Sequence, residues 1–208
     1  MKFIDMDSWA RREIFDFFTA AGRPFYSITF RLDVARAYRY ARINGLSFYH
    51  CMTWLVTKAA NSVEAFRYSI EDGRVALLPE RRPSFTDMKK GADFFHICTM
   101  DFVDGDIAAY CAHASERSKN QPGFISYADE RSDLLYISCL PWLELTGLTN
   151  EGQLAEDDCI PRISWGKAVT EGDERLMMGF SLEVNHRFID GADIGKFALE
   201  LERLMEEL

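Results

Sequence analysis

Several patterns that mark common protein classes are missing from this sequence. None of the five cysteines belongs to a CxxC pair, and their odd number and wide spacing indicate reduced thiols, with neither a disulfide framework nor a zinc site. Neither a GxGxxG nor a P-loop pattern occurs, so the usual signatures of dinucleotide and NTP binding are absent. No apolar run approaches the roughly 18–20 residues that span a bilayer. We therefore expect neither a metal centre nor a membrane span.

Positive charge is also in short supply. Lysine and arginine together number 24, against 33 aspartates and glutamates, which gives a net charge of −9. Binding to nucleic acid or to an anionic membrane surface requires a basic stripe, and none is visible. The first residues, MKFIDMDSWARREIF, lack the apolar core of a signal peptide. The chain is therefore expected to be a soluble, cytoplasmic protein with no nucleic-acid or membrane partner.

Apolar and aromatic residues, by contrast, are abundant. Hydrophobic residues make up 48% of the 208 positions and include 16 Phe, 8 Tyr and 4 Trp, so the chain can bury a substantial core. No internal repeat and no linker rich in Gly, Ser or Pro divides it. We expect one domain over residues 1–208.

Helical and strand patterns interleave along the chain. Apolar residues at helical spacing, with capping residues at several ends, predict helices over 8–21, 33–44, 47–61, 107–119 and 191–208. Runs rich in aromatic and β-branched residues predict strands over 25–32, 66–70, 74–78, 93–103, 134–140, 160–169 and 175–186. Because turns link several of these strands directly, the pattern favours an α+β fold, a two-layer sandwich in which a mixed, mostly antiparallel sheet packs with helices.

One of the four histidines stands apart because of its position. His186 ends the apolar strand GFSLEVNH and is followed by Asp190, Gly191 and a predicted helix. An imidazole beside a glycine-containing turn is well placed to point into a cleft, where histidine can take a proton from an alcohol or thiol at neutral pH. On the HxxxDG spacing alone, a His–Asp pair that only caps a strand–helix junction is the simpler explanation.

Other motifs accompany HxxxDG in a fixed order. They are Trp9 to Phe15, Leu32-Asp33, Ser47-Phe48-Tyr49, Phe66-Arg67, Asp72-Gly73, Phe95-His96 with Thr99 and Phe102, Ile137 to Trp142, Ser164 to Lys167, and Val184 to Gly191. With these motifs the chain resembles the chloramphenicol acetyltransferase family over nearly its whole length. The resemblance implies the fold of that family, transfer of acetyl groups from acetyl-CoA, and a homotrimer with active sites at the subunit interfaces.

The resemblance also implies roles for single residues in catalysis. His186 matches the general base that deprotonates the acceptor hydroxyl, and Ser138 matches the serine whose hydroxyl stabilises the tetrahedral oxyanion. Asp190 matches the aspartate that holds the catalytic turn, and its arginine partner in the family falls at Arg11. Ser164 matches a threonine that holds a water near the transition state. No acyl-enzyme is needed, because both substrates meet directly in one site.

Further matches concern the two substrates. Trp142 and Tyr49 match positions that line the coenzyme A tunnel, and Lys167 matches a lysine near the adenosine 3′-phosphate. The acceptor pocket of the family falls at Phe17, Phe18, Phe102, Tyr136 and Leu148. At Phe18, Tyr136 and Leu148 the residue departs from the family pattern, and Asn185 replaces the first histidine of its His-His-x-x-x-Asp-Gly motif. These departures reshape the acceptor site and leave the transfer machinery intact.

The resemblance therefore predicts an acetyl-CoA-dependent O-acetyltransferase, an enzyme of antibiotic resistance that acts on chloramphenicol or a similar small molecule and needs no metal. Two alternatives stay open: the same chemistry on a different hydroxylated acceptor, and a non-catalytic trimeric protein that binds a ligand in the same fold. The acyltransferase cores of 2-oxoacid dehydrogenase complexes share HxxxDG, but they normally carry lipoyl domains and flexible linkers, and neither is seen in this sequence.

Overall fold

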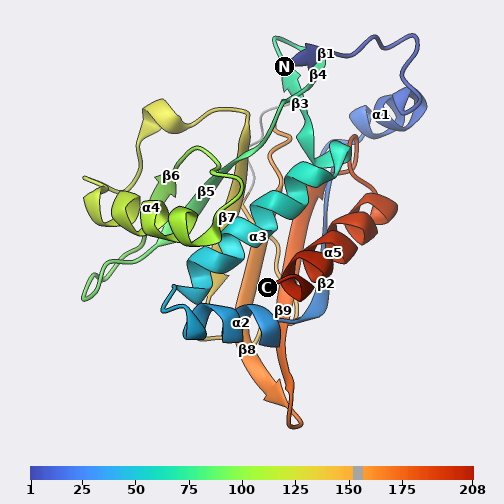
Figure 1. Ribbon diagram of the computed structural model, residues 1–208. Helices are drawn as coiled ribbons and strands as arrows, with labels where there is room; N and C mark the ends of the chain where they lie inside the picture. Colours follow the sequence, from blue (N-terminus) through green and yellow to red (C-terminus); the bar gives the residue numbers. More distant parts are fainter. Residues whose placement is uncertain (152–156) are drawn as a thin grey trace.

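A mixed six-stranded sheet forms the centre of the computed structural model, which describes residues 1–151 and 157–208 (Figure 1). Its strands lie in the order β2-β9-β8-β7-β5-β6. Strand β7 runs parallel to β8 and to β5, and the other neighbouring pairs are antiparallel. The strands are β2 (Phe25–Asp33), β5 (Arg82–Asp87), β6 (His96–Thr99), β7 (Leu134–Leu140), β8 (Arg162–Glu171) and β9 (Arg175–Asn185).

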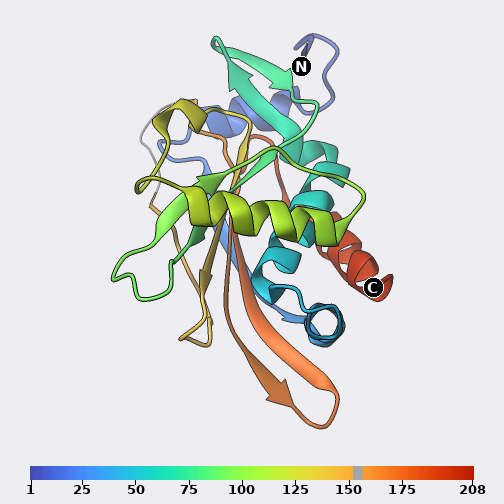
Figure 2. The same cartoon turned by 60° about the vertical axis from the view of Figure 1, so that its left-hand side comes forward.

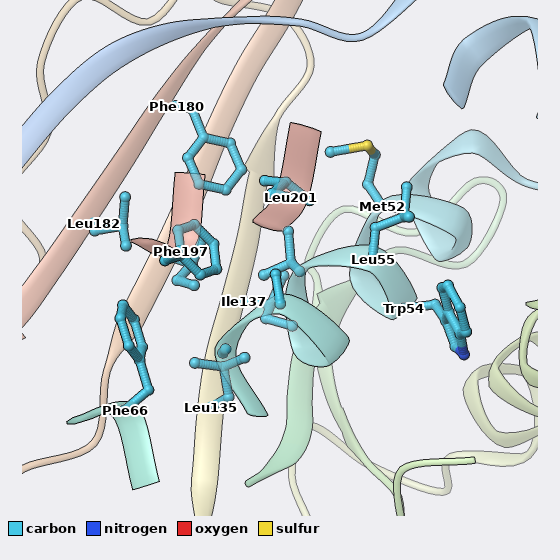
Figure 3. Packing of buried hydrophobic residues seen from close by; sticks show 14 of the residues in the cluster. Met52, Trp54, Leu55, Phe66, Leu135, Ile137, Phe180, Leu182, Phe197 and Leu201 are labelled. Carbon is cyan, nitrogen blue, oxygen red and sulfur yellow. The ribbon is translucent and has the colours of Figure 1, made fainter. Parts of the chain in front are cut away.

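Helices cover one face of this sheet, as Figures 1 and 2 show from two directions. Helix α3 lies in the middle of this layer and packs against α2, α4 and α5. The four helices are α2 (Ala35–Ile43), α3 (Phe48–Ser62), α4 (Ile107–Asn120) and α5 (Gly191–Glu206). Apolar side chains from both layers meet between them, and Figure 3 shows part of this core: Met52, Trp54 and Leu55 of α3, Leu135 and Ile137 of β7, Phe180 and Leu182 of β9, and Phe197 and Leu201 of α5. This architecture confirms the predicted α+β class.

A smaller antiparallel sheet and the first helix lie beside the main sheet (Figure 1). Trp9, just before the helix, packs edge-on against Tyr68 and brings this region onto the core. The remaining elements are β1 (Lys2–Phe3), α1 (Arg12–Thr19), β3 (Tyr68–Glu71), β4 (Arg74–Leu77) and the 3-10 turns η1 (Glu64–Arg67) and η2 (Tyr127–Asp129). No helix within the described residues is long and apolar enough to cross a lipid bilayer.

The face of the main sheet opposite the helices carries a row of hydroxyl groups. Because side chains alternate along a strand, the neighbours of the core residues point to this face. The strand register pairs Ser138 with Ser164, Ser164 with Ser181, and Ser181 with Thr29. On the other side of β7, the Oγ1 atom of Thr86 lies 3.2 Å from Ser138 Oγ. We call these five residues on five adjacent strands the hydroxyl row.

Residues 143–150, here called the crossing segment, fold back from the end of β7 over this polar face. Two glycines leave room for it: a Cβ atom at Gly179 would lie 1.9 Å from the carbonyl oxygen of Leu145, and one at Gly166 would lie 2.6 Å from that of Leu143. The N–H of Lys167 donates to the Leu143 carbonyl at 2.6 Å, next to an irregularity in the β8–β9 register. The backbone of the crossing segment therefore lies directly on the sheet.

Most predicted elements are present, but several predicted boundaries were wrong. Helix α1 begins at Arg12 rather than at residue 8, because the Ser8 hydroxyl donates to Asp5 instead of capping the helix. Of the strand predicted over 93–103, only His96–Thr99 (β6) is a strand. The strand predicted from residue 66 begins at Tyr68, because a 3-10 turn precedes it. Strand β5 was not predicted, because two arginines and a proline obscure its pattern. Arg81, directly before β5, is fully buried and donates to four backbone carbonyls, which satisfies its guanidinium.

Candidate active site

His186 lies just beyond the end of β9 and is held between two aromatic rings. Its backbone N–H donates to the carbonyl of Pro24 at 2.7 Å. The imidazole stacks on Phe18 with a centroid separation of 4.0 Å and an interplanar angle of 10°, and Tyr26 lies on it at 4.3 Å. Nδ1 is buried with no hydrogen-bond partner among the described residues. The two aromatic rings therefore hold the imidazole in place, without a hydrogen bond at Nδ1 from the described residues.

The turn after His186 is tied down by Asp190. Its side chain caps helix α5 by accepting from the N–H groups of Ala192 and Asp193, and Asp193 completes the capping box. Arg11 donates from Nη1 to Asp190 Oδ2 at 3.0 Å and from Nε to the carbonyl of Arg187 at 3.0 Å. Burial favours the protonated form of Asp190, but the Arg11 hydrogen bond and the backbone N–H groups of Asp193 and Ala192 outweigh it and lower the pKa of this carboxyl.

Tyr26 was not predicted as a site residue, because it alternates along β2 in step with the core residues Ile28 and Phe30 and so resembles another core residue. Its hydroxyl donates to the carbonyl of Ile189 at 3.3 Å, inside the same turn. Burial and the nearby charge of Asp190 raise the pKa of Tyr26 to about 12. The phenol therefore stays protonated at neutral pH and keeps this hydrogen bond. Only pairing of β2 with the end of β9 brings Tyr26 to His186.

The hydrogen bonds in the hydroxyl row differ from one member to the next. Thr29 donates to Ser181 at 3.1 Å, and the Ser181 hydroxyl donates to the carbonyl of Leu148 at 3.4 Å. Ser164 donates to the side-chain oxygen of Asn150, also at 3.4 Å. Within the described residues, the Ser138 hydroxyl has Thr86 as its one partner. Ser138 is therefore the serine of the row whose proton has no fixed acceptor in the crossing segment.

A buried carboxylate anchors the crossing segment next to this row. Glu183 is 1% exposed, and it accepts from Arg23 at 2.8 Å, from the Ser27 hydroxyl at 3.1 Å and from the backbone N–H of Asn150 at 2.7 Å. The side-chain nitrogen of Asn150 is buried without a hydrogen-bond partner among the residues that the structure describes. Neither Glu183 nor Asn150 carries a sequence signal, because their proximity depends on the path of the crossing segment.

The residues predicted for coenzyme A lie near one end of β7 and β8. The Tyr49 hydroxyl donates to the carbonyl of Thr86 at 2.5 Å, and burial raises the pKa of this phenol well above its ordinary value. Trp142, directly after β7, is 70% exposed, and the Lys167 side chain is also exposed. The indole of Trp142 and the ammonium group of Lys167 are therefore both accessible at the surface.

The residues predicted for the acceptor pocket lie in three places. Phe17 is 73% exposed and lies edge-on to Phe18, beside His186. Tyr136 and Leu148 lie on the polar face, where the Tyr136 hydroxyl donates to Glu130 at 2.9 Å; burial and this carboxylate raise the pKa of the phenol. Phe102 lies apart from both groups, against the rings of Trp54 and Tyr110.

The two parts of the candidate site lie far apart within one chain. His186 is five residues beyond Ser181 along β9, and Ser181 pairs through Ser164 with Ser138 two strands away. The strand rise and the spacing between strands place the two side chains about 17 Å apart along the strands and about 10 Å apart across them. One chain therefore does not bring His186 and Ser138 to the same reacting atom. The described residues also hold no group of three or more His, Cys, Asp or Glu side chains able to bind a metal ion.

Known proteins similar to this chain share both its sequence and its fold. Residues 1–202 match the family model described as chloramphenicol acetyltransferase. A chloramphenicol acetyltransferase of Clostridium perfringens is 27% identical over 214 residues, which cover 97% of each protein. A solved chloramphenicol acetyltransferase structure, 27% identical, matches with a TM-score of 0.90 over 99% of this chain and 100% of that one. A probable dihydrolipoamide acetyltransferase from Listeria monocytogenes, 15% identical with a TM-score of 0.66 over 96% and 92% of the two chains, shares the fold alone.

Proposed function

The chain belongs to the chloramphenicol acetyltransferase family and is an acyltransferase, and from this premise we propose that it moves the acetyl group of acetyl-CoA to a hydroxyl of chloramphenicol or a similar small molecule. The observation that carries the proposal is the setting of His186. Its ring is clamped between Phe18 and Tyr26, and its turn is held by Asp190 and Arg11. A base that needs no rearrangement before it accepts a proton is what direct attack on a thioester requires.

In the proposed reaction, His186 takes the proton of the acceptor hydroxyl while the hydroxyl oxygen attacks the thioester carbonyl. The new C–O bond forms as the carbonyl π electrons move to oxygen, which becomes the oxyanion of a tetrahedral intermediate. When the intermediate collapses, the C–S bond breaks and the sulfur of coenzyme A leaves with its electron pair. The protonated His186 then returns its proton to that sulfur, so the base is restored.

Ser138 is assigned to the oxyanion because its hydroxyl proton has no acceptor in the crossing segment, unlike those of Ser164 and Ser181. A hydroxyl aimed at developing negative charge stabilises the transition state more than the ground state. The Ser164 proton is directed to Asn150, so Ser164 would hold a water by accepting a hydrogen bond from it.

The distance between His186 and Ser138 supports an assembly in which each site spans two subunits. We place His186 of one subunit opposite Ser138 of its neighbour in a homotrimer with active sites at the interfaces. Coenzyme A would lie along Tyr49, Trp142 and Lys167. The acceptor would lie among Phe17, Phe18, Phe102, Tyr136 and Leu148, and each chain acts as a single domain over 1–208.

A second candidate function keeps the chemistry and changes the acceptor. It is favoured by the polar pair of Tyr136 and Glu130 beside the hydroxyl row, where Glu130 Oε1 is buried and has no hydrogen-bond partner in the described part of the chain. A buried acceptor of this kind selects ligands that carry a hydrogen-bond donor. An acceptor substrate with an additional hydroxyl or amino group could donate a hydrogen bond to Glu130 at this position.

The proposal is tested by chloramphenicol-dependent release of coenzyme A from acetyl-CoA. Replacing His186 by Ala should lower kcat about 10²–10⁴-fold, the usual contribution of a positioned general base. His113→Ala is the control, since His113 is exposed on α4 and should leave the rate unchanged. A His186→Ala variant with nearly full rate would contradict the mechanism. Coenzyme A binding without turnover of chloramphenicol would direct the search to acceptors with an extra donor group.

A further inference from the structure

Within the proposed function, on which this inference rests, we propose that Thr86 is a positioning residue that donates a hydrogen bond to Ser138 and so directs the Ser138 proton toward the oxyanion. Thr86 lies on β5, a strand that was not predicted and that contains none of the sequence motifs associated with the site. Its Oγ1 atom is 3.2 Å from Ser138 Oγ, and either oxygen could be the donor from position alone. The direction of this one bond decides whether Ser138 has a proton to offer.

The rest of the hydroxyl row shows how the protein directs such protons. Thr29 donates a hydrogen bond to Ser181, and the Ser181 hydroxyl donates one to the backbone carbonyl of Leu148. In this pair the threonine donates and the serine uses its proton elsewhere. Thr86 and Ser138 form the equivalent pair at the other end of the row, but no carbonyl of the crossing segment accepts from Ser138 within the described residues. The Ser138 hydroxyl is therefore free to donate to a group of the bound substrate instead of to a protein carbonyl.

Thr86 is rigid enough to set this direction. Its strand is paired on both sides, with β6 and β7, and a β-branched residue has few χ1 choices. Its backbone carbonyl accepts from the Tyr49 hydroxyl at 2.5 Å. Donation from Thr86 occupies a lone pair of Ser138 Oγ, so the Ser138 proton must point away from β5. It also polarises the Ser138 hydroxyl and makes it the stronger donor.

The kinetic test replaces Thr86 by Val, which keeps the β-branched shape and removes the donor. We expect kcat to fall about tenfold, the effect of one net hydrogen bond, with the KM for acetyl-CoA and for chloramphenicol unchanged. Thr86→Ser keeps the hydroxyl but not the β-branch, and should retain most of the wild-type kcat. Thr29→Val is the matched control, because it removes the donor of the other threonine–serine pair and should leave kcat unchanged. Equal losses in the two valine variants would overturn the proposal by showing a general effect on the sheet.

A double-mutant cycle separates positioning from a direct role. If Thr86 acts only through the Ser138 hydroxyl, Thr86→Val should have no further effect on kcat in a Ser138→Ala background. A second tenfold loss in that background would overturn the proposal, because it would mean that Thr86 contacts the reacting groups itself.

The proton direction is also open to a measurement that needs no activity. A neutron structure of the protein exchanged into D₂O should show a deuteron on Thr86 Oγ1 directed at Ser138 Oγ, and the Ser138 deuteron directed away from β5. A Ser138 deuteron directed at Thr86 would overturn the inference. Lack of acetyl transfer to any acceptor would contradict the proposed function, and the deuteron positions would still decide the role of Thr86.

Discussion

Among single residues, Arg11 makes contacts that no neighbouring cation could replace. Its guanidinium bonds Asp190 and the carbonyl of Arg187 and lies 3.5 Å from Asp193, so it connects the start of α1 to both ends of the turn after His186. A lysine presents a point charge and cannot span three acceptors in this geometry. The orientation of His186 is thus linked to a residue far away in the sequence.

Replacing Arg11 by Ala should make the protein more sensitive to acid. Because the pKa of Asp190 is lowered in the folded state, this group contributes stability above its unfolded value of about 3.9. That contribution is lost as the pH falls through the folded pKa. Arg11→Ala removes the main cause of the lowering, so acid unfolding, followed by circular dichroism, should begin at higher pH, and kcat should fall.

Arg12→Ala is the matched control for this prediction. Arg12 is the adjacent cation, and it pairs with Asp7 and Asp16 on the exposed side of α1. Its loss should change the free energy of unfolding by no more than about 0.5 kcal/mol. An acid-unfolding curve for Arg11→Ala that coincides with the wild-type curve would show that the pair does not stabilise the turn.

At the scale of elements, the contact between the crossing segment and strands β8 and β9 depends on glycine. Gly179→Ala would place a methyl group 1.9 Å from the Leu145 carbonyl oxygen, so the backbone must shift. Overpacking of this kind costs about 1–3 kcal/mol in the free energy of unfolding, and the displaced segment should also reduce kcat. Gly22→Ala meets nothing within 4 Å and should be neutral in denaturant unfolding. Equal stability of both variants would mean that the segment does not lie on β9.

The same element is held at its other end by Glu183. Replacing this residue by Ala leaves the Asn150 N–H and the Ser27 hydroxyl, both partly buried, without their acceptor. We expect unfolding to become easier by about 1–3 kcal/mol, measured by urea denaturation. Glu174→Ala, in the exposed turn between β8 and β9, is the control and should have little effect. An unchanged urea midpoint for Glu183→Ala would contradict this anchoring role.

At the scale of the whole molecule, the separation of His186 from Ser138 makes activity a property of the assembly. If each site joins His186 of one subunit to Ser138 of another, His186→Ala and Ser138→Ala subunits should complement each other. Random mixing in a trimer gives about one quarter of the sites both intact groups, so a refolded mixture should regain about that share of wild-type activity. A mixture no more active than the mean of the two variants would place both groups in one chain's site.

The α+β class, most of the helices and strands and the HxxxDG turn could be predicted from the sequence, because these depend on local periodicity and on residues close together in the chain. Arg11, Ser138 and Ser164 were also predicted as site residues, but only because the chain resembles a known family. Strand β5 could not be predicted in this way, because no apolar pattern marks its start. Arg81 and Arg82 are buried there with hydrogen bonds and an ion pair to groups far away in the sequence.

Which side chains meet in the site depends on how the strands and the crossing segment pack together. Tyr26 reaches His186 through the β2–β9 register, and Thr86 reaches Ser138 through the β5–β7 register. The protons of Ser164 and Ser181 are directed by a segment that crosses the sheet over two glycines. Registers and crossings of this kind arise from packing between residues far apart in sequence, so no local pattern contains them. The same register separates His186 from Ser138, and for that reason the catalytic proposal requires a second subunit.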